Sequence, residues 1–397
     1  MSLQEQAKSD CPSCGALAMT PFYEVREVPV HSCIMLHTER EALDFPTGDI
    51  GLGICRHCGF MSNIWFDRTV QDYTSAYEDQ QSFSPTFNSF ASRLAQQLID
   101  KYDLREKTVV EIGCGKGDFL VQVCEMGNNR GVGIDPTCVR ERIESPALDR
   151  ITIVQDYYSE RYADYQGDLV MCRHTLEHIH DTRRFVSTIR KAIADREDTV
   201  VFFEIPDATT VLKDQVFWDI YYEHCSYFSP GSLARLFRSC GFEVVDLYRE
   251  YDDQYLLIEA KPVSVASIKT HALEESVEQM VSDVERFAQL VPPKLEGWRQ
   301  KIRALGQGDR RPVIWGSGSK CVAFLTTLGI RDEIGCVVDI NPHRQGKFIP
   351  GVGLQVMAPE YLKQYRPQSI VVMNPIYAAE ITEMVRNMQL ETDVTTV

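Results

Sequence analysis

One short stretch, TVVEIGCGKGDF at residues 108–119, constrains the fold of this chain more than any other. An apolar run leads into three glycines at alternate positions, Gly113, Gly115 and Gly117. Such a run predicts a buried strand, and the glycines after it let the backbone turn sharply and approach a small molecule. The spacing is GxGxG, not the GxGxxG of dinucleotide-binding folds, and Glu111 precedes it. The stretch predicts a small-molecule site, with an ordinary turn before a helix as the alternative.

Further apolar runs repeat this design along the chain. They span residues 131–135, 151–156, 168–174, 199–206, 242–248 and 255–262. Helical stretches separate the first five of the seven runs and the last two are adjacent, which predicts a mainly parallel sheet with a closing hairpin. Asp135 ends the second run about 20 residues after the glycines, where related α/β folds bind a ribose diol. Asp156 ends the third run in the same way.

The acidic residue, the glycines and the order of the runs resemble class I S-adenosylmethionine-dependent methyltransferases. The resemblance implies an α/β fold built on a seven-stranded sheet with helices on both faces. It also implies that S-adenosylmethionine lies on the glycine loop, with its ribose on Asp135 and its adenine amino group beside Asp156. The cofactor-binding residues implied in this way are Glu111, Gly113, Gly115, Gly117, Asp135 and Asp156.

Two CxxC motifs lie near the N-terminus, with 40 residues between them and a glycine after each. A glycine suits the turn in which backbone N–H groups point at thiolates, and four thiolates complete a closed tetrahedral zinc site. Such a site has no open position for water, so we expect a structural Zn²⁺ and not a catalytic one. Free thiols or redox pairs are the alternative. The predicted ligands are Cys11, Cys14, Cys55 and Cys58.

Composition narrows the classes of partner. Acidic residues outnumber basic ones by 57 to 41, and the resulting net charge of −16 opposes binding to nucleic acid or an anionic membrane surface. No apolar run is long enough to span a bilayer, and no secretion signal is evident. Many of the 13 cysteines lie in apolar runs, which suits a reducing compartment. We therefore expect a cytoplasmic protein and leave its oligomeric state open.

Polar and aromatic residues gather in two segments that follow predicted strands. FWDIYYEHCSYFS, residues 217–229, follows the fifth strand, and RHTLEHIHD, residues 173–181, ends the fourth and would face it. Because open α/β sheets bind ligands beyond the C-terminal ends of their strands, the two segments predict an active site. A lid that only covers the cofactor is the alternative for the first segment. The missing HExxH order disfavours a catalytic metal in the second.

The CxxC pairs, the core pattern, the YxEHxSYFS segment and WGSGSK...VVDINPHRQGKFIPG near the C-terminus together resemble the nucleotide-sugar C-methyltransferases. Members of that family methylate keto-deoxyhexoses carried on a nucleoside diphosphate. The resemblance therefore implies C-methylation next to a ketone of a nucleotide-linked sugar. It also implies a general base, His224, in an active site formed by Tyr221, Glu223, His224 and His178.

The chemistry explains these residue types. A neutral imidazole near physiological pH suits removal of the proton beside a ketone. Glu223 would orient that imidazole or bind a sugar hydroxyl, and His178 or Tyr221 would stabilise the enolate oxygen. Two departures from the family pattern, Tyr222 in place of a second histidine and YDDQYLL at residues 251–257 in place of a glycine-containing segment, leave alternatives open. These are an O- or N-methyltransferase acting on a sugar or polysaccharide precursor, and a zinc-ribbon binding protein with a degenerate core.

The length of 397 residues favours two or three domains. We expect a zinc-binding module, a methyltransferase core, a helical linker and a Rossmann-like domain at residues 1–70, 71–262, 263–309 and 310–397. Apolar residues of the linker recur at helical spacing until Pro292 and Pro293, where we expect the helix to end. In the last domain GSGSK and Asp339 imitate a dinucleotide site, but Cys321 replaces the third glycine. The resemblance implies instead a wall of the substrate cleft.

Overall fold

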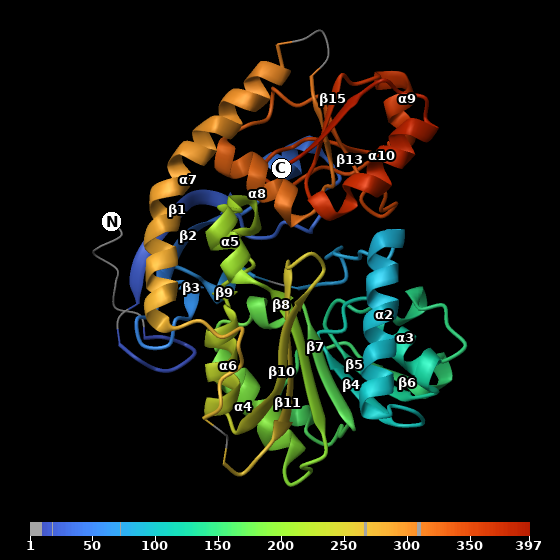
Figure 1. Cartoon of the computed structure of the whole chain (residues 1–397). Helices are drawn as coiled ribbons and strands as arrows, with labels where there is room; N and C mark the ends of the chain where they lie inside the picture. Colours follow the sequence, from blue (N-terminus) through green and yellow to red (C-terminus); the bar gives the residue numbers. More distant parts are fainter. Residues whose placement is uncertain (1–9, 18, 72, 266–267, 308–310) are drawn as a thin grey trace.

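The computed structural model describes residues 10–17, 19–71, 73–265, 268–307 and 311–397, and a seven-stranded sheet forms its centre (Figure 1). The strands occur in the order β10-β11-β8-β7-β4-β5-β6, and β11 runs antiparallel to both of its neighbours while β8, β7, β4, β5 and β6 are parallel. This order confirms the class I methyltransferase fold. The strands are β4 (Thr108–Ile112), β5 (Arg130–Ile134), β6 (Ile151–Val154), β7 (Leu169–Arg173), β8 (Val200–Pro206), β10 (Phe242–Glu250) and β11 (Tyr255–Pro262).

Helices cover both faces of this sheet. α2 and α3 share one apolar cluster with the sheet, and α4 and α6 share a second cluster that contains the alternate residues of the same strands. In α2 the Ser84 hydroxyl accepts a hydrogen bond from Phe87 N and a proline follows this cap, so the helix begins at Pro85. These helices are α2 (Pro85–Tyr102), α3 (Asp118–Gly127), α4 (Thr182–Ile193) and α6 (Pro230–Ser239). α5 (Ala208–Asp214) follows β8 and packs in the apolar cluster of the N-terminal module.

The N-terminal module is a small antiparallel sheet that takes in a piece of the core. Its strand order is β1-β2-β3-β9, and β9 comes from the YxEHxSYFS segment, where Tyr227 pairs with Met61. The module therefore holds the segment that carries the predicted base. Its elements are β1 (Thr20–Pro29), α1 (Glu39–Leu43), β2 (Thr47–Ile54), β3 (Met61–Asn63) and β9 (Ser226–Tyr227).

The linker forms one long helix, α7 (Val277–Leu305), which contains Pro292 and Pro293, so the predicted end of the helix at these prolines is wrong. Each proline lacks a backbone N–H, which costs the helix about 3 kcal/mol. Packing on both sides offsets this cost. Phe287 lies in the core of the N-terminal module, and Trp298 lies in that of the C-terminal domain. The helix therefore packs against both the N-terminal module and the C-terminal domain (Figure 1).

The C-terminal domain is a five-stranded parallel sheet in the order β14-β13-β12-β15-β16, as the Rossmann-like prediction requires. No helix among the described residues is long and apolar enough to cross a membrane. The strands are β12 (Val313–Trp315), β13 (Cys336–Val338), β14 (Val356–Met357), β15 (Ser369–Val372) and β16 (Asp393–Thr396). The helices are α8 (Ser319–Leu328), α9 (Leu362–Tyr365) and α10 (Ala378–Asn387).

Candidate active site and cofactor site

The glycine loop joins β4 to α3 at the C-terminal end of the central strand. Gly113, Gly115 and Gly117 have φ values of +71°, +53° and +87°, a region that favours glycine. A Cβ at Gly113 would lie 1.9 Å from Thr175 Oγ1, whereas a Cβ at Gly115 would meet no described heavy atom within 4 Å. The loop is therefore packed against the segment after β7 at its first glycine and open at its second.

Glu111 is buried beside this loop, with 2% of its surface exposed. Its Oε2 atom has no hydrogen-bond partner among the described residues. Burial, with a contribution from the Asp135 carboxylate and against the opposing charge of Arg173, raises the pKa of Glu111 to about 8. A buried carboxyl oxygen without a partner, next to open loop backbone, fits a ligand that brings hydrogen-bond donors and positive charge. S-adenosylmethionine has both.

The two predicted acidic contacts occupy different environments. Asp135 accepts hydrogen bonds from Gly115 N at 2.9 Å and from Thr137 N at 2.6 Å, so its carboxylate lies at the glycine loop. Asp156 follows β6, where it binds Tyr162 and other groups of its own segment. The structure thus brings Asp135 to the loop and leaves Asp156 in a local network.

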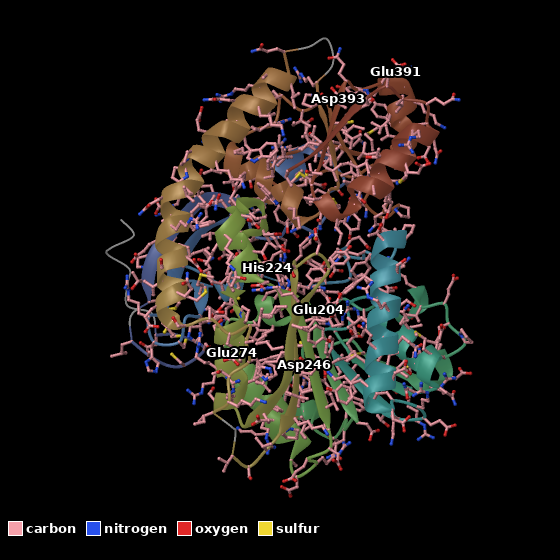
Figure 2. The ribbon with its side chains drawn as sticks, in the orientation of Figure 1. Glu204, His224, Asp246, Glu274, Glu391 and Asp393 are labelled. Carbon is pink, nitrogen blue, oxygen red and sulfur yellow. The ribbon has the colours of Figure 1, made fainter. Side chains whose placement is uncertain are left out.

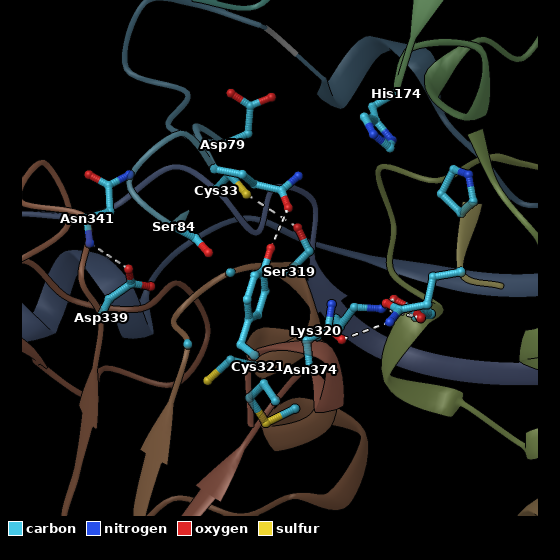
Figure 3. A pocket seen from close by; sticks show the side chains of 18 of the residues that line it. Cys33, Asp79, Ser84, His174, Ser319, Lys320, Cys321, Asp339, Asn341 and Asn374 are labelled. Carbon is cyan, nitrogen blue, oxygen red and sulfur yellow. Dashed lines mark hydrogen bonds and ion pairs between the residues drawn. The ribbon is translucent and has the colours of Figure 1, made fainter. Parts of the chain in front are cut away.

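A cavity of about 330 Å³ lies between the core and the C-terminal domain. Figure 2 places His224 in this middle region, and Figure 3 shows His174 on one side with Lys320 and Asn374 on another. The core contributes His174, Glu177, His178, Tyr221, His224, Gln254 and Tyr255. The C-terminal domain contributes Ser319, Lys320, Asp339, Asn341, Arg344, Asn374 and Tyr377. Both polar segments identified in the sequence therefore border one cavity.

His224 is buried, with 6% of its surface exposed. Its Nε2 lies 2.8 Å from the Tyr221 hydroxyl, and its ring centre is 4.9 Å from that of His178. Burial lowers the pKa of His224 well below its usual range, and the charges of His178, Lys320 and His174 act in the same direction. The imidazole is therefore neutral at physiological pH and able to accept a proton.

Glu223, in contrast, does not line the cavity. Its carboxylate is 3.1 Å from His31 Nδ1 and also accepts a hydrogen bond from Ser32, and both partners belong to the N-terminal module. His178 lines the cavity, and its Nδ1 lies 2.8 Å from the Tyr73 hydroxyl and 3.1 Å from the Glu223 carbonyl. Of the four predicted catalytic residues, the structure brings three together, and the Glu223 carboxylate is engaged elsewhere.

Sequence reasoning assigned no role to His174, although it noted the crowding of polar residues in its segment. His174 Nε2 lies 2.7 Å from Glu204 Oε1, and Glu204 also binds Arg173 through two hydrogen bonds. Burial disfavours the charged ring, but Glu204 and Glu177 outweigh it and raise the pKa of His174 to about 9. The cavity thus has a charged histidine and a neutral one.

The β10–β11 hairpin, flagged in the sequence at residues 251–257, forms a contact between the core and the C-terminal domain. Tyr251 donates a hydrogen bond to the Tyr377 hydroxyl at 2.7 Å, and Gln254 Nε2 donates to Asn374 Oδ1 at 3.0 Å. Gln254 and Tyr255 also line the cavity. The hairpin therefore helps to form the cavity wall.

The four N-terminal cysteines converge as predicted. Cys11 Sγ is 3.7 Å from Cys58 Sγ, Cys14 Sγ is 3.6 Å from Cys55 Sγ, and all four sulfurs lie within 4.8 Å of one another. Four Zn–S bonds of about 2.3 Å in tetrahedral geometry separate the sulfurs by about 3.8 Å. Gly15 and its counterpart after the second pair have positive φ. The arrangement fits a tetrathiolate metal site.

Comparisons with known proteins agree with this architecture. Residues 87–247 match the methyltransferase domain family, and residues 259–393 match the C-methyltransferase C-terminal domain family. The chain is 29% identical over 309 residues to the C-methyltransferase NovU of Streptomyces niveus, across 73% of this chain and 72% of that one.

Similar solved structures cover less than half of this chain. One is the 1,6-didemethyltoxoflavin-N1-methyltransferase of Burkholderia thailandensis, with 18% identity and a TM-score of 0.33 over 44% of this chain and 79% of that one. Another is the dimethyltransferase RosA of Streptomyces davawensis, with 19% identity and a TM-score of 0.36 over 45% of this chain and 56% of that one.

The strand order, the glycine loop and the two matched domains together show that the chain belongs to the class I S-adenosylmethionine-dependent methyltransferases and carries a C-methyltransferase C-terminal domain.

Proposed function

We propose that the enzyme methylates a carbon next to the ketone of a nucleotide-linked sugar, with His224 as the general base. The observation that carries this proposal is a buried, neutral imidazole on the wall of a cavity between the cofactor-binding core and the C-terminal domain. The similarity of the chain to the C-methyltransferase NovU supports carbon as the methylated atom. His224 would take the proton beside the ketone and leave an enolate to accept the methyl group.

Tyr221 suits the enolate oxygen. Burial raises the pKa of Tyr221 well above its usual range, and the Asp219 and Glu223 charges add to this effect. The hydroxyl therefore stays protonated, and it lies beside the base, 2.8 Å from His224 Nε2. A protonated donor at this position would stabilise the negative charge that develops on the substrate oxygen.

The cofactor would lie on the glycine loop, with its amino group near Glu111 and its ribose on Asp135. When bound it supplies an electrophilic methyl group on a sulfonium. The open space at Gly115 and the unpartnered Glu111 oxygen support this position. We place its adenine toward Asp156, which follows β6, the edge strand two positions from β4 in the sheet.

The C-terminal wall supports an anionic substrate. Two cations, Lys320 and Arg344, border the cavity in a chain whose net charge is −16. Lys320 pairs with Asp219, and Arg344 donates to Ser317 Oγ at 3.3 Å. Lys320 and Arg344 are the groups that would bind the phosphates of a nucleoside diphosphate, and Asp339 and Glu380 border the same wall.

We further propose that Cys11, Cys14, Cys55 and Cys58 bind one structural Zn²⁺. Metal analysis should find about one zinc per chain. Cys55→Ser should lose the metal and lower the melting temperature. Full zinc content and unchanged melting in Cys55→Ser would exclude this ligand set, whereas Cys336→Ser, at a buried cysteine of the C-terminal domain, should keep the zinc.

The test of the main proposal uses His224→Gln, with His37→Gln at an exposed histidine as the matched control. Assayed on nucleoside-diphosphate-linked ketosugars, His224→Gln should lose about a hundredfold to ten-thousandfold in kcat, as is typical of a removed general base. S-adenosylmethionine affinity should not change. NMR of the product should place the methyl on carbon.

A methyl group on oxygen or nitrogen in that product would favour the O- or N-methyltransferase alternative. Wild-type rates in His224→Gln would remove His224 as the base. A protein that binds no S-adenosylmethionine would overturn the whole proposal.

A further inference from the structure

We infer that Glu177 positions the His224 imidazole through one water molecule in a small cavity next to the ring. The inference rests on the proposed function, in which His224 is the base. It gives Glu177 the orienting role that the sequence suggested for Glu223, whose carboxylate binds His31 and Ser32 instead.

The protonation of the ring follows from its hydrogen bond with Tyr221. The Tyr221 hydroxyl, which stays protonated, lies 2.8 Å from His224 Nε2, and we assign it as the donor of this hydrogen bond. The single proton of the neutral imidazole then lies on Nδ1, which needs an acceptor. A catalytic histidine is held in the correct tautomer by such an acceptor on its second nitrogen.

Glu177 is a buried carboxylate available for this role. Only 3% of its surface is exposed, and its Oε2 has no hydrogen-bond partner within the described part of the chain. Its Oε1 lies 3.7 Å from His174 Nδ1, which is too far for a hydrogen bond. One carboxylate oxygen of Glu177 and one ring nitrogen each of His178 and His224 lie within 4.8 Å of one another. A buried acceptor without a partner costs free energy, so we expect a hydrogen-bond donor to occupy the space beside Glu177 Oε2.

A second cavity of about 10 Å³ is lined by Glu177 and His224. Ser226, Tyr227 and Asp219, whose carboxylate pairs with Lys320, also line it, and the other side chains around it are apolar. The Tyr227 hydroxyl is also buried and without a partner among the described side chains. The volume is about that of one water molecule, and the Glu177 carboxylate and the His224 imidazole are the polar partners that it would join. Two hydrogen bonds of about 2.8 Å through that water span the distance between carboxylate and imidazole.

During proton transfer, the Glu177 carboxylate would stabilise the positive charge that forms on the His224 ring. When the substrate binds, the Tyr221 hydroxyl would turn its proton from Nε2 to the ketone oxygen, which frees the Nε2 lone pair. Nε2 then takes the proton beside the ketone, the C–H electron pair stays on the substrate as the enolate, and the ring becomes an imidazolium. Nδ1–H continues to donate to the water, which donates to the Glu177 carboxylate. The negative carboxylate thus stabilises the imidazolium without touching the substrate, so Glu177 is a positioning residue.

Glu177→Gln tests this role, because it keeps the volume and removes the charge. We expect kcat to fall about 10- to 100-fold with little change in S-adenosylmethionine affinity. The acidic limb of the pH profile should move to lower pH, since the imidazolium loses its counter-charge. Exchange of the proton beside the ketone in deuterium oxide, without methyl donor, should slow in parallel, and Glu177→Asp should restore part of the rate.

Glu259→Gln is the matched control, because Glu259 is equally buried but binds Tyr248 and Lys101 away from the cavity. It should leave the pH profile unchanged even if stability falls. If Glu177→Gln does not fold, Tyr227→Phe tests the same water, and it should shift the acidic limb in the same direction by a smaller amount.

The inference and the proposed function fail separately. A wild-type kcat and pH profile in Glu177→Gln, beside an inactive His224→Gln, would overturn the inference alone, as would an unchanged profile in Tyr227→Phe. A divalent metal that binds beyond the first zinc and is lost in Glu177→Gln would replace the water with a metal site. An active His224→Gln would overturn the proposed function first.

Discussion

The two glycine loops of this chain, GCGKG at residues 113–117 and GSGSK at residues 316–320, have the same local plan and different surroundings. Each follows a strand inside a parallel sheet and leads into a helix. In each, the carboxylate after the neighbouring strand returns to the loop. Asp135 accepts from Gly115 N at 2.9 Å, and Asp339 accepts from Ser317 N at 2.8 Å.

The surroundings differ in what occupies the space beside the loop. In the core, Gly115 is open and Glu111 lies two residues before the first glycine. In the C-terminal domain, Ile314 holds the equivalent place, and a Cβ at Gly318 would lie 3.4 Å from the Arg344 guanidinium. The same motif thus forms an open loop beside Glu111 in one domain, whereas in the other domain Arg344 contacts the loop, which forms part of the cavity wall. The motif predicts the backbone turn, but the side chains around the loop determine whether a ligand has room to bind there.

The sharpest contrast between the loops should come from their two aspartates. Asp135→Ala should weaken S-adenosylmethionine binding about a hundredfold, because two buried ribose hydroxyls lose their acceptor. Asp339→Ala should change that affinity less than about twofold. Calorimetry on both variants measures the difference. Equal losses in the two would show that the loops are not functionally distinct, and no loss in Asp135→Ala would remove the ribose assignment.

A single added methyl group distinguishes the loops by about tenfold in cofactor affinity. In Gly115→Ala the methyl enters the open space of the cofactor, and its φ of +53° adds about 1 kcal/mol of strain. Gly318→Ala needs no positive φ and should bind S-adenosylmethionine normally. Thermal melting of both variants without cofactor measures the backbone strain separately from the loss of S-adenosylmethionine affinity. Normal affinity in Gly115→Ala would place the cofactor elsewhere.

Glu111 should make the cofactor-free core sensitive to pH. Because burial raises its folded pKa from 4.5 to about 8, the folded state holds a proton that the unfolded state releases. Stability therefore falls as pH rises from about 4.5 to about 8, and Glu111→Gln should be more stable than the parent above pH 8 by roughly 1–3 kcal/mol. Urea unfolding at pH 5 and pH 8.5 measures this. A stability difference that does not grow with pH would contradict the buried, unpartnered state.

The smallest effect concerns the contact that joins the two domains. Tyr251→Phe removes the hydrogen bond to Tyr377, at a cost of about 1 kcal/mol in stability. The KM of the proposed sugar substrate should rise a few-fold at unchanged S-adenosylmethionine affinity, because only the cavity wall is loosened. Tyr377→Phe and the double variant complete the cycle. Additive effects would mean that the two hydroxyls are not coupled.

Local patterns explain why most of the fold was predictable. Each strand of the core lies within about a residue or two of an apolar run, because side chains that alternate between two helical layers must be apolar on both sides. The prolines of α7 show the limit of this reasoning. Their local preference ends a helix, but Phe287 and Trp298 pack into different domains, and the sequence contains no sign of those partners.

The candidate site divides in the same way. Tyr221, His178 and His224 line the cavity as the family pattern implies, whereas Glu223, adjacent to His224, turns toward the N-terminal module. Tyr221 to His224 form a turn, in which His224 N donates to the Tyr221 carbonyl at 3.1 Å. Side chains that are adjacent in a turn point in different directions, so adjacency in sequence does not imply a shared site.

By itself, the sequence determined the features that depend on a few consecutive residues: the glycine turn after β4, the paired cysteines with their glycines, and the apolar strands. Only the tertiary structure decided which carboxylate lies near His224, which of the two glycine loops stays open, and where the β10–β11 hairpin meets the C-terminal domain. The physical reason is that burial and charge at the cavity are sums over side chains far apart in the chain. His224 is neutral and His174 is charged because of groups up to about 100 residues away, which no local pattern contains.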